Sequence, residues 1–267
     1  MKNSRQSKSF IETIRKYYEL ILFLTYREIR IRYKQTLLGV VWTVLQPLLQ
    51  MAVFTFVFSR LGKMDSEGLP YPVFVLTGLI LWSFFSSALS RGVPIIINYP
   101  GLVTKIYFPR EIFPTFATLG LLVDYICSFL VLMGFYLIFK TPIHLTGIVL
   151  SFFILFILII FTIGFLFFAS TINVFFRDAT YAVNLLIQVW FFMTPVVYPL
   201  SKIPMEFRVL YDLNPMVGLV ESYRSLLIHG TILDAKLLLE SLVMSAITFY
   251  FGYRFLKRYE MKLADVI

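Results

Sequence analysis

Six apolar segments, each about 18 to 28 residues long, constrain this chain more than any other feature of its sequence. Charged side chains are nearly absent from all six, which cover residues 39–58, 71–89, 113–139, 146–173, 181–200 and 237–255. A helix of roughly 20 residues crosses the hydrocarbon core of a bilayer, which is about 30 Å thick. The pattern therefore predicts an all-α polytopic membrane protein with six transmembrane helices.

The distribution of basic residues predicts how these helices are oriented. If the N-terminus lies inside the cell, 17 of the 24 Lys and Arg residues fall in inner segments. Cytoplasmic loops of membrane proteins carry such an excess of Lys and Arg. We therefore expect both termini in the cytoplasm, and we interpret the net charge of +9 as a consequence of topology rather than of nucleic-acid binding.

Three regions follow from this topology: a cytoplasmic N-terminus (1–38), a transmembrane domain (39–255) and a cytoplasmic tail (256–267). The first region contains no recognisable signal peptide, because charges interrupt each of its apolar runs. The chain has one cysteine, and its two histidines are far apart, so no ligand spacing predicts a metal site. No residue pattern predicts a catalytic site.

Residues 17–34 are predicted to form an amphipathic helix at the inner membrane interface. Arg27, Arg30 and Lys34 recur at spacings of three and four, opposite an apolar face. Such a basic stripe can bind a lipid phosphate, or it can simply anchor the helix on the cytoplasmic side. The sequence leaves both alternatives open.

The connection 91–112 is unusually apolar for a cytoplasmic loop and is also basic. Pro94, Pro100 and Pro109 divide it into short pieces, because proline disrupts helices. We expect this segment to dock on a partner protein, with an interfacial position on lipid as the alternative.

The connection 201–236 is predicted to contain a helix over 215–228. Asn214 is a favourable N-cap, Pro215 suits the first helical position, and Gly230 suits the C-terminal end. This helix either dips into the outer leaflet as a gate or rests on the surface.

Polar side chains within the spans indicate a transport pathway, because they are costly in a bilayer. In the first span, Thr43, Gln46 and Gln50 lie on one helical face that continues to Phe54. A similar face in the fifth span carries Tyr181, Asn184, Gln188, Phe191 and Phe192. Amides and aromatic rings suit a neutral, ring-shaped cargo such as a sugar. The alternative is that the amides only form hydrogen bonds between packed helices.

Two other polar features in the spans are interpreted as structural. Ser83, Ser86, Ser87 and Ser90 form a ridge typical of helix packing. Asp124 is the only carboxylate buried in a span, since Glu240 lies close to the end of the last one, and the span of Asp124 offers no nearby basic residue. We therefore expect a structural role for Asp124 rather than proton coupling.

The chain contains no apparent source of energy for transport. It has no G-x-x-x-x-G-K-[ST] motif, so it cannot hydrolyse ATP with a P-loop. It also shows no internal repeat of the kind found in many secondary transporters. Six spans and a docking loop therefore predict the membrane half of a larger complex.

Five segments spread over nearly the whole chain carry a family resemblance. They are YREIRIRYKQTLLGVVWTVLQPL (26–48), NYPGLVTKIYFPREIFP (98–114), NVFFRDATY (173–181), TPVVYPL (194–200) and LNPMVGLVESYRSLL (213–227). In this order, they resemble the membrane subunits of type-2 ABC exporters that move O-antigen, capsule or teichoic-acid polysaccharides.

The resemblance implies a homodimer in the bacterial cytoplasmic (inner) membrane, with two copies of a separate ATPase subunit. ATP and magnesium would bind to that partner, and this chain would hold no cofactor. The cargo would be a lipid-linked polysaccharide. Coupling to the ATPase is implied for Asn98, Tyr99, Pro100, Gly101, Leu102, Lys105, Pro109, Arg110 and Glu111.

The resemblance also implies that spans one and five border a channel, to which it adds Tyr198. An outer gate is implied for Asn214, Pro215, Tyr223 and Arg224. Attraction of the diphosphate headgroup is implied for Arg27, Arg30, Arg32 and Lys34. Two alternatives remain open: a type-2 ABC permease for a drug or small lipid, and a membrane scaffold of a polysaccharide-synthesis complex.

Overall fold

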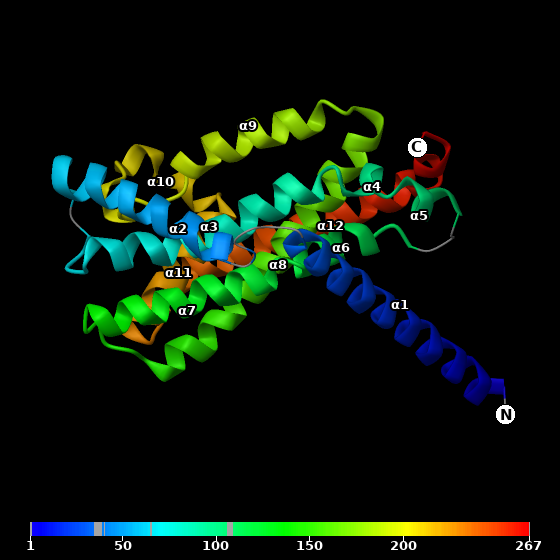
Figure 1. Ribbon diagram of the computed structural model, residues 1–267, viewed down its shortest axis with the longest axis horizontal. Helices are drawn as coiled ribbons and strands as arrows, with labels where there is room; N and C mark the ends of the chain where they lie inside the picture. The colour runs from blue at the N-terminus through cyan, green and yellow to red at the C-terminus, as the bar shows by residue number, and fades with distance from the viewer. Residues whose placement is uncertain (1, 35–38, 40, 65, 106–108, 267) are drawn as a thin grey trace.

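The computed structural model describes residues 2–34, 39, 41–64, 66–105 and 109–266 (Figure 1). Within these ranges the chain forms helices and turns, and no strand occurs in them. The predicted all-α fold is therefore confirmed for the part of the chain that the structure describes.

Five helical segments are long and apolar enough to cross a membrane. The first joins α2 (Val41–Phe54) to the π-helical turn η1 (Thr55–Leu61), and the third joins α6 (Ile112–Leu119) to α7 (Leu122–Ile138). The other three are α3 (Tyr71–Gly92), α8 (Leu145–Phe175) and α12 (Ala235–Val266). These segments agree with five of the six predicted spans.

The predicted span at 181–200 is not a continuous helix. Its helix α9 covers Ala179–Phe192, which is 14 residues, or about 21 Å at 1.5 Å per residue. The chain then turns before the short 3-10 helix η2 (Leu200–Lys202). Pro195 and Pro199 lie in this turn, and neither can supply the backbone N–H that a longer helix would need.

Helices α3 and α8 form the centre of the bundle, with α7, α11 and α12 packed around them (Figure 1). The backbones of α8 and α12 approach closely at Gly164, where an added Cβ would lie 2.5 Å from the Cα of Phe249. Small residues permit such close packing in membrane helices. By contrast, α2 and α9 lie at the side of the bundle and are exposed or half-buried along most of their length.

The predicted helix at 215–228 is confirmed as α11 (Pro215–His229). The Asn214 side chain accepts a hydrogen bond from the Met216 N–H at 3.1 Å, and Gly230 ends the helix with a left-handed φ of 72°. Of the two alternatives for this helix, a position on the surface is wrong, because all of its residues from Pro215 to Ile228 except Glu221 are buried. It packs against α3, α8 and α12.

The connections also contain helices. At the N-terminus, α1 (Lys2–Tyr33) is longer than the predicted helix at 17–34 and extends away from the bundle (Figure 1). The connection 91–112 contains α4 (Ile95–Asn98) and α5 (Pro100–Lys105), and its residues 106–108 lie outside the described ranges. Helix α10 (Met205–Asp212) precedes α11.

Candidate functional site

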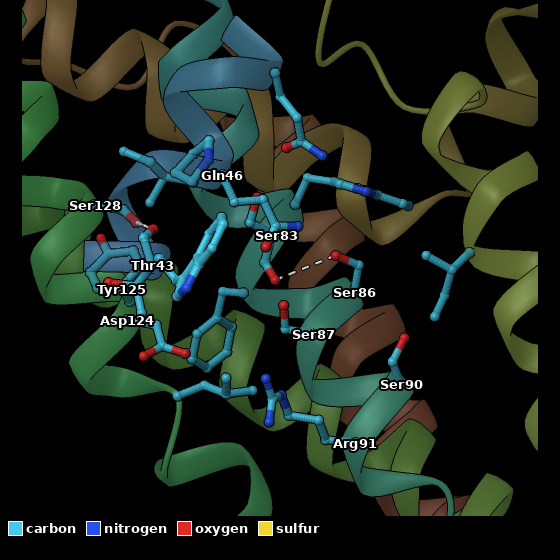
Figure 2. Close-up of a pocket in the computed structure, with 18 of the residues that line it drawn as sticks. Thr43, Gln46, Ser83, Ser86, Ser87, Ser90, Arg91, Asp124, Tyr125 and Ser128 are labelled. Carbon is cyan, nitrogen blue, oxygen red and sulfur yellow. Dashed lines mark hydrogen bonds between the residues drawn. The ribbon is translucent and has the colours of Figure 1, made fainter. Parts of the chain in front are cut away.

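A cavity of about 1060 Å³ lies between α2, α3, α7 and α9 (Figure 2). Cavities that hold drug-sized ligands measure roughly 300–1,000 Å³, so this space can accept a ligand at least that large. Its walls combine hydroxyl groups, amides and aromatic rings, which is unusual for a surface inside a membrane bundle.

The cavity brings together most of the residues predicted to line a channel. Helix α2 contributes Thr43, Gln46, Gln50 and Phe54, and α9 contributes Asn184, Gln188, Phe191 and Phe192. The two helices meet where the Phe54 and Phe191 rings stack, with centroids 5.5 Å apart. The polar faces that were identified separately in the sequence thus belong to one site.

Two residues predicted for this set lie elsewhere. Tyr181 is 77% exposed near the start of α9 and does not line the cavity. Tyr198 lies in the turn after α9, where its hydroxyl donates to the Phe192 carbonyl oxygen at 2.6 Å. Because the turn replaces the expected helix, Tyr198 leaves the face that Gln188 and Phe192 share.

The serine ridge of α3 was interpreted only as a packing surface, and that interpretation is incomplete. Ser83, Ser86, Ser87 and Ser90 all line the cavity (Figure 2). Ser90 also donates a hydrogen bond to Asn184 Oδ1 at 2.9 Å, which links α3 to α9. The spacing of these serines matches that of the polar face in α2, so the same criterion could have identified them.

One end of the cavity is charged. Arg32 Nη1 donates to Asp124 Oδ2 at 2.9 Å and to the Gly120 carbonyl oxygen at 3.1 Å, while the Tyr33 hydroxyl donates to Asp124 Oδ1. Burial raises the pKa of Tyr33 well above its usual range, and the adjacent Asp124 adds to this effect. Arg91, at the end of α3, lines the same part of the cavity.

This ion pair distinguishes Arg32 from the other basic residues at the end of α1. The Arg32 side chain is 7% exposed and is held by Asp124, whereas Arg27, Arg30 and Lys34 are exposed. The span of Asp124 offers no basic residue, and its partner Arg32 lies 92 residues away in sequence. Asp124 thus ties α1 to α7.

The predicted coupling segment is bound to α12 on one side. The Arg110 backbone N–H donates to Glu260 Oε1 at 3.0 Å, and its Nη2 donates to the Val103 carbonyl oxygen at 2.6 Å. Lys257 Nζ lies 2.8 Å from Glu111 Oε2. These contacts join the segment to the C-terminal half of α12.

The same segment contacts α1 through Tyr99. Its hydroxyl donates to Glu28 Oε2 at 2.8 Å, and Arg27 lies over its ring at 5.4 Å from the centroid. Burial, together with the Glu28 hydrogen bond, raises the pKa of Tyr99 to about 12. Asn98, Pro100 and Gly101 are exposed beside it, while Leu102 and Pro109 are half-buried. The side chain of Lys105 lies outside the described residues.

The predicted gate residues hold the turn that follows α9. Arg224, 3% exposed, donates through Nη2 to the Pro195 and Val196 carbonyl oxygens at 3.0 and 3.3 Å. Its Nη1 lies 2.5 Å from Glu221 Oε1, and the guanidinium stacks over the Phe74 ring at 3.7 Å. These contacts were not predictable from the helical pattern, because the Pro195 and Val196 carbonyl groups lie 29 and 28 residues away in sequence.

Two further predicted gate residues support the same region. Asn214 Nδ2 donates to the Met193 carbonyl oxygen at 3.1 Å, and its Oδ1 accepts from Trp190 Nε1 at 2.9 Å. The Tyr223 hydroxyl lies 3.0 Å from the Tyr125 hydroxyl in the buried core. Pro215 begins α11 beside them.

The described residues contain no group of three or more His, Cys, Asp or Glu that could hold a metal ion. The fold and the cavity define a class of protein: a multi-pass helical membrane protein with a polar space between its helices. Such a space is typical of proteins that move polar molecules across membranes.

The chain belongs to the ABC-2 type transporter family, whose model matches residues 19–228. Members of this family are membrane subunits of transporters and are not themselves catalytic. The chain is 31% identical over 245 residues to the O-antigen export system permease protein RfbA of Myxococcus xanthus. The alignment covers 89% of this chain and 92% of the relative.

Two other relatives point in the same direction. An O-antigen export system permease protein RfbA of Klebsiella pneumoniae is 29% identical, over 80% of this chain and 82% of the relative. The polysialic acid transport protein KpsM of Escherichia coli is 26% identical, over 86% of this chain and 89% of the relative. The resemblance inferred from the sequence motifs is thereby confirmed.

Proposed function

We propose that this chain is the membrane subunit of an ABC transporter that exports a lipid-linked polysaccharide, such as O-antigen, capsule or teichoic acid, across the bacterial cytoplasmic membrane. The observation that carries the proposal is the cavity of about 1060 Å³ lined by hydroxyls, amides and aromatic rings. Its support comes from relatives that are named as O-antigen export and polysialic acid transport proteins.

The lining of the cavity suits a sugar chain. Hydroxyl and amide groups such as those of Ser87, Gln46 and Gln188 can exchange hydrogen bonds with sugar hydroxyls. The faces of Phe54 and Phe191 offer flat apolar surfaces for sugar rings. Because the described residues that line the middle of the cavity include no charged group, a neutral polymer can move along it without being trapped.

The energy for export would come from two copies of a separate cytoplasmic ATPase subunit, which would bind ATP and magnesium. The exposed Asn98, Pro100 and Gly101 provide the surface on which each copy would dock. Movement of this segment would reach α12 through Arg110 and Glu111 and would reach α1 through Tyr99. Such a shift of packed helices is a common way to switch a transporter between states.

The transporter would be a homodimer, with α2 and α9 bordering the shared pathway. Both helices have little buried surface within one chain: only 11% of the most apolar stretch of Val41–Leu61 is buried, and α9 has one buried residue, Ile187. With α1 at the cytoplasmic interface, its exposed Arg27, Arg30 and Lys34 would attract the diphosphate of the lipid anchor.

At the other end of the cavity, the outer gate would be formed by the turn after α9 and the residues that hold it in place. Asn214, Pro215, Tyr223 and Arg224 would keep this turn closed in the resting state.

Deletion and complementation of the gene test the proposal. We expect that cells without the chain accumulate polymer inside and lose it from the surface, and that the purified chain brings down a P-loop ATPase in equal amount. Normal surface polymer with loss of drug or lipid export would instead indicate a permease for a smaller cargo. Copurification with glycosyltransferases and no ATPase would indicate a scaffold.

A further inference from the structure

The charged groups of the cavity are confined to one end. Among the described residues, Arg32, Arg91 and Asp124 are the charged side chains that line it, and they come from α1, α3 and α7. Figure 2 shows Arg91 below the serines and Asp124 across the cavity from Ser87, with the Arg91 guanidinium turned toward the side on which Asp124 lies. The three groups together carry a net charge of +1.

The carboxylate of Asp124 accepts a hydrogen bond on each of its two oxygens. Asp124 Oδ2 accepts from Arg32, and Asp124 Oδ1 accepts from the Tyr33 hydroxyl. It therefore neutralises Arg32 and fixes the position of that side chain. Within the part of the chain that the structure describes, Arg32 Nε and Nη2 are buried and have no hydrogen-bond partner. Arg32 thus retains donors for a further acceptor.

Arg91 is the second cation, and the carboxylates close enough to act on its charge are Asp124 and Glu28. In the described ranges its guanidinium forms no hydrogen bond or ion pair of its own. Arg32 is close enough to Arg91 for the two positive charges to oppose each other. Two guanidinium groups that line one end of a cavity together with one carboxylate are stabilised when an anion enters.

We infer that this end of the cavity is a phosphate-binding site in which Arg91 is the direct ligand and Arg32 the second cation. Asp124 and Tyr33 act as positioning residues that hold Arg32. Guanidinium groups suit this task because their planar donors match phosphate oxygens in a bidentate arrangement. The ligand class is a diphosphate group, carried either by a lipid or by a free anion.

The position of the site explains how it would serve the proposed function, on which it rests. A diphosphate held by Arg91 would place the attached sugar beside Ser87 and Ser90, the next cavity residues along α3. The anchor would therefore be recognised inside the cavity, beyond the exposed basic stripe of α1. Recognition would be followed directly by contact between the sugar and the polar lining.

Binding to the purified full chain, with whatever ATPase subunit it retains, tests the inference in phosphatidylcholine nanodiscs. The probes are labelled farnesyl diphosphate, farnesol and inorganic diphosphate. We expect Arg91→Gln to weaken binding of farnesyl diphosphate by roughly tenfold to hundredfold, as the loss of charge-assisted hydrogen bonds implies. Arg91→Lys should retain part of the affinity, since it keeps the charge but not the planar donors.

The matched control is Arg254→Gln, which removes an exposed arginine of α12 outside the cavity and should leave binding unchanged. If inorganic diphosphate binds with the same dependence on Arg91, the anion alone is recognised. If only farnesyl diphosphate binds, the ligand is a lipid headgroup. Farnesol binding as tightly as farnesyl diphosphate, or an unchanged affinity of the folded Arg91→Gln or Arg91→Lys variant, would overturn the site.

The outcome is separable from that of the proposed function. If deletion of the gene leaves surface polysaccharide intact while the chain still binds diphosphate through Arg91, the site stands and polysaccharide export is wrong. If export depends on the chain but diphosphate binding does not depend on Arg91, export stands and the site is wrong.

Discussion

The Arg32–Asp124 pair gives the sharpest test of how α1 is attached to the bundle. Asp124→Asn removes the negative charge that faces a guanidinium of only 7% exposure, while keeping the size of the side chain. Loss of one partner of a fully buried ion pair costs about 3–5 kcal/mol. Asp124 is 23% exposed, and asparagine still offers one acceptor oxygen, so we expect a cost of about 2 kcal/mol.

The assay is reversible unfolding of the full chain in mild detergent as the fraction of a denaturing detergent is raised. A cost of about 2 kcal/mol changes the ratio of folded to unfolded chains roughly thirtyfold. Combining Asp124→Asn with Arg32→Gln in a double-mutant cycle isolates the pair itself, and we expect a coupling energy of at least about 1 kcal/mol.

The control is an ion pair of the same kind on the exposed face of α1. Arg15 and Glu19 lie 2.7 Å apart, but their side chains are 78% and 58% exposed. We expect Glu19→Gln to cost less than about 0.5 kcal/mol. If Asp124→Asn costs no more than this control, or if the two substitutions of the cycle are additive, the pair does not hold α1 to α7.

Three further predictions concern other parts of the bundle. Arg224→Lys should lower the thermal unfolding midpoint in detergent, because lysine cannot make both carbonyl contacts and the ring contact. An unchanged midpoint would contradict the role of Arg224 in holding the turn after α9. Gly147→Ala should destabilise the folded chain by about 2 kcal/mol or more, since the added Cβ would lie 1.9 Å from a carbonyl oxygen of α11. The control is Gly101→Ala, whose added Cβ meets open space and should leave the unfolding midpoint unchanged. Equal effects of the two would refute this packing argument. Gln188→Trp should reduce surface polysaccharide several-fold at normal protein abundance, as measured by immunoblot, because it fills the cavity between α2 and α9; normal export would contradict the pathway.

Much of the fold follows from local patterns in the sequence. Apolar length identifies five of the spans, and the capping residues Asn214 and Gly230 place both ends of α11 within one residue. The polar faces of α2 and α9 were also readable, because a helix repeats every 3.6 residues and polar groups are costly in a bilayer. These signals depend only on residues that are close in sequence, so they can be identified without knowledge of the tertiary structure.

The features that sequence reasoning missed depend on contacts between distant segments. Arg32 and Asp124 are 92 residues apart, so neither span alone reveals the pair. A charged residue such as Arg224 is usually exposed on a helix, but here it is buried because its guanidinium donates hydrogen bonds to carbonyl groups of the turn after α9. The end of α9 was missed because an apolar run continues past Phe192, although its prolines marked the break.

We predict that the polymer passes between α2 and α9, and site-specific photo-crosslinking tests this prediction most directly. A photoreactive residue is placed at Gln188 inside the cavity and, as the control, at Phe156, which is 57% exposed on α8. In cells that are making polysaccharide, we expect the polymer to be crosslinked at Gln188 and not at Phe156. Absence of polymer at Gln188, or equal crosslinking at both positions, would contradict export through this cavity.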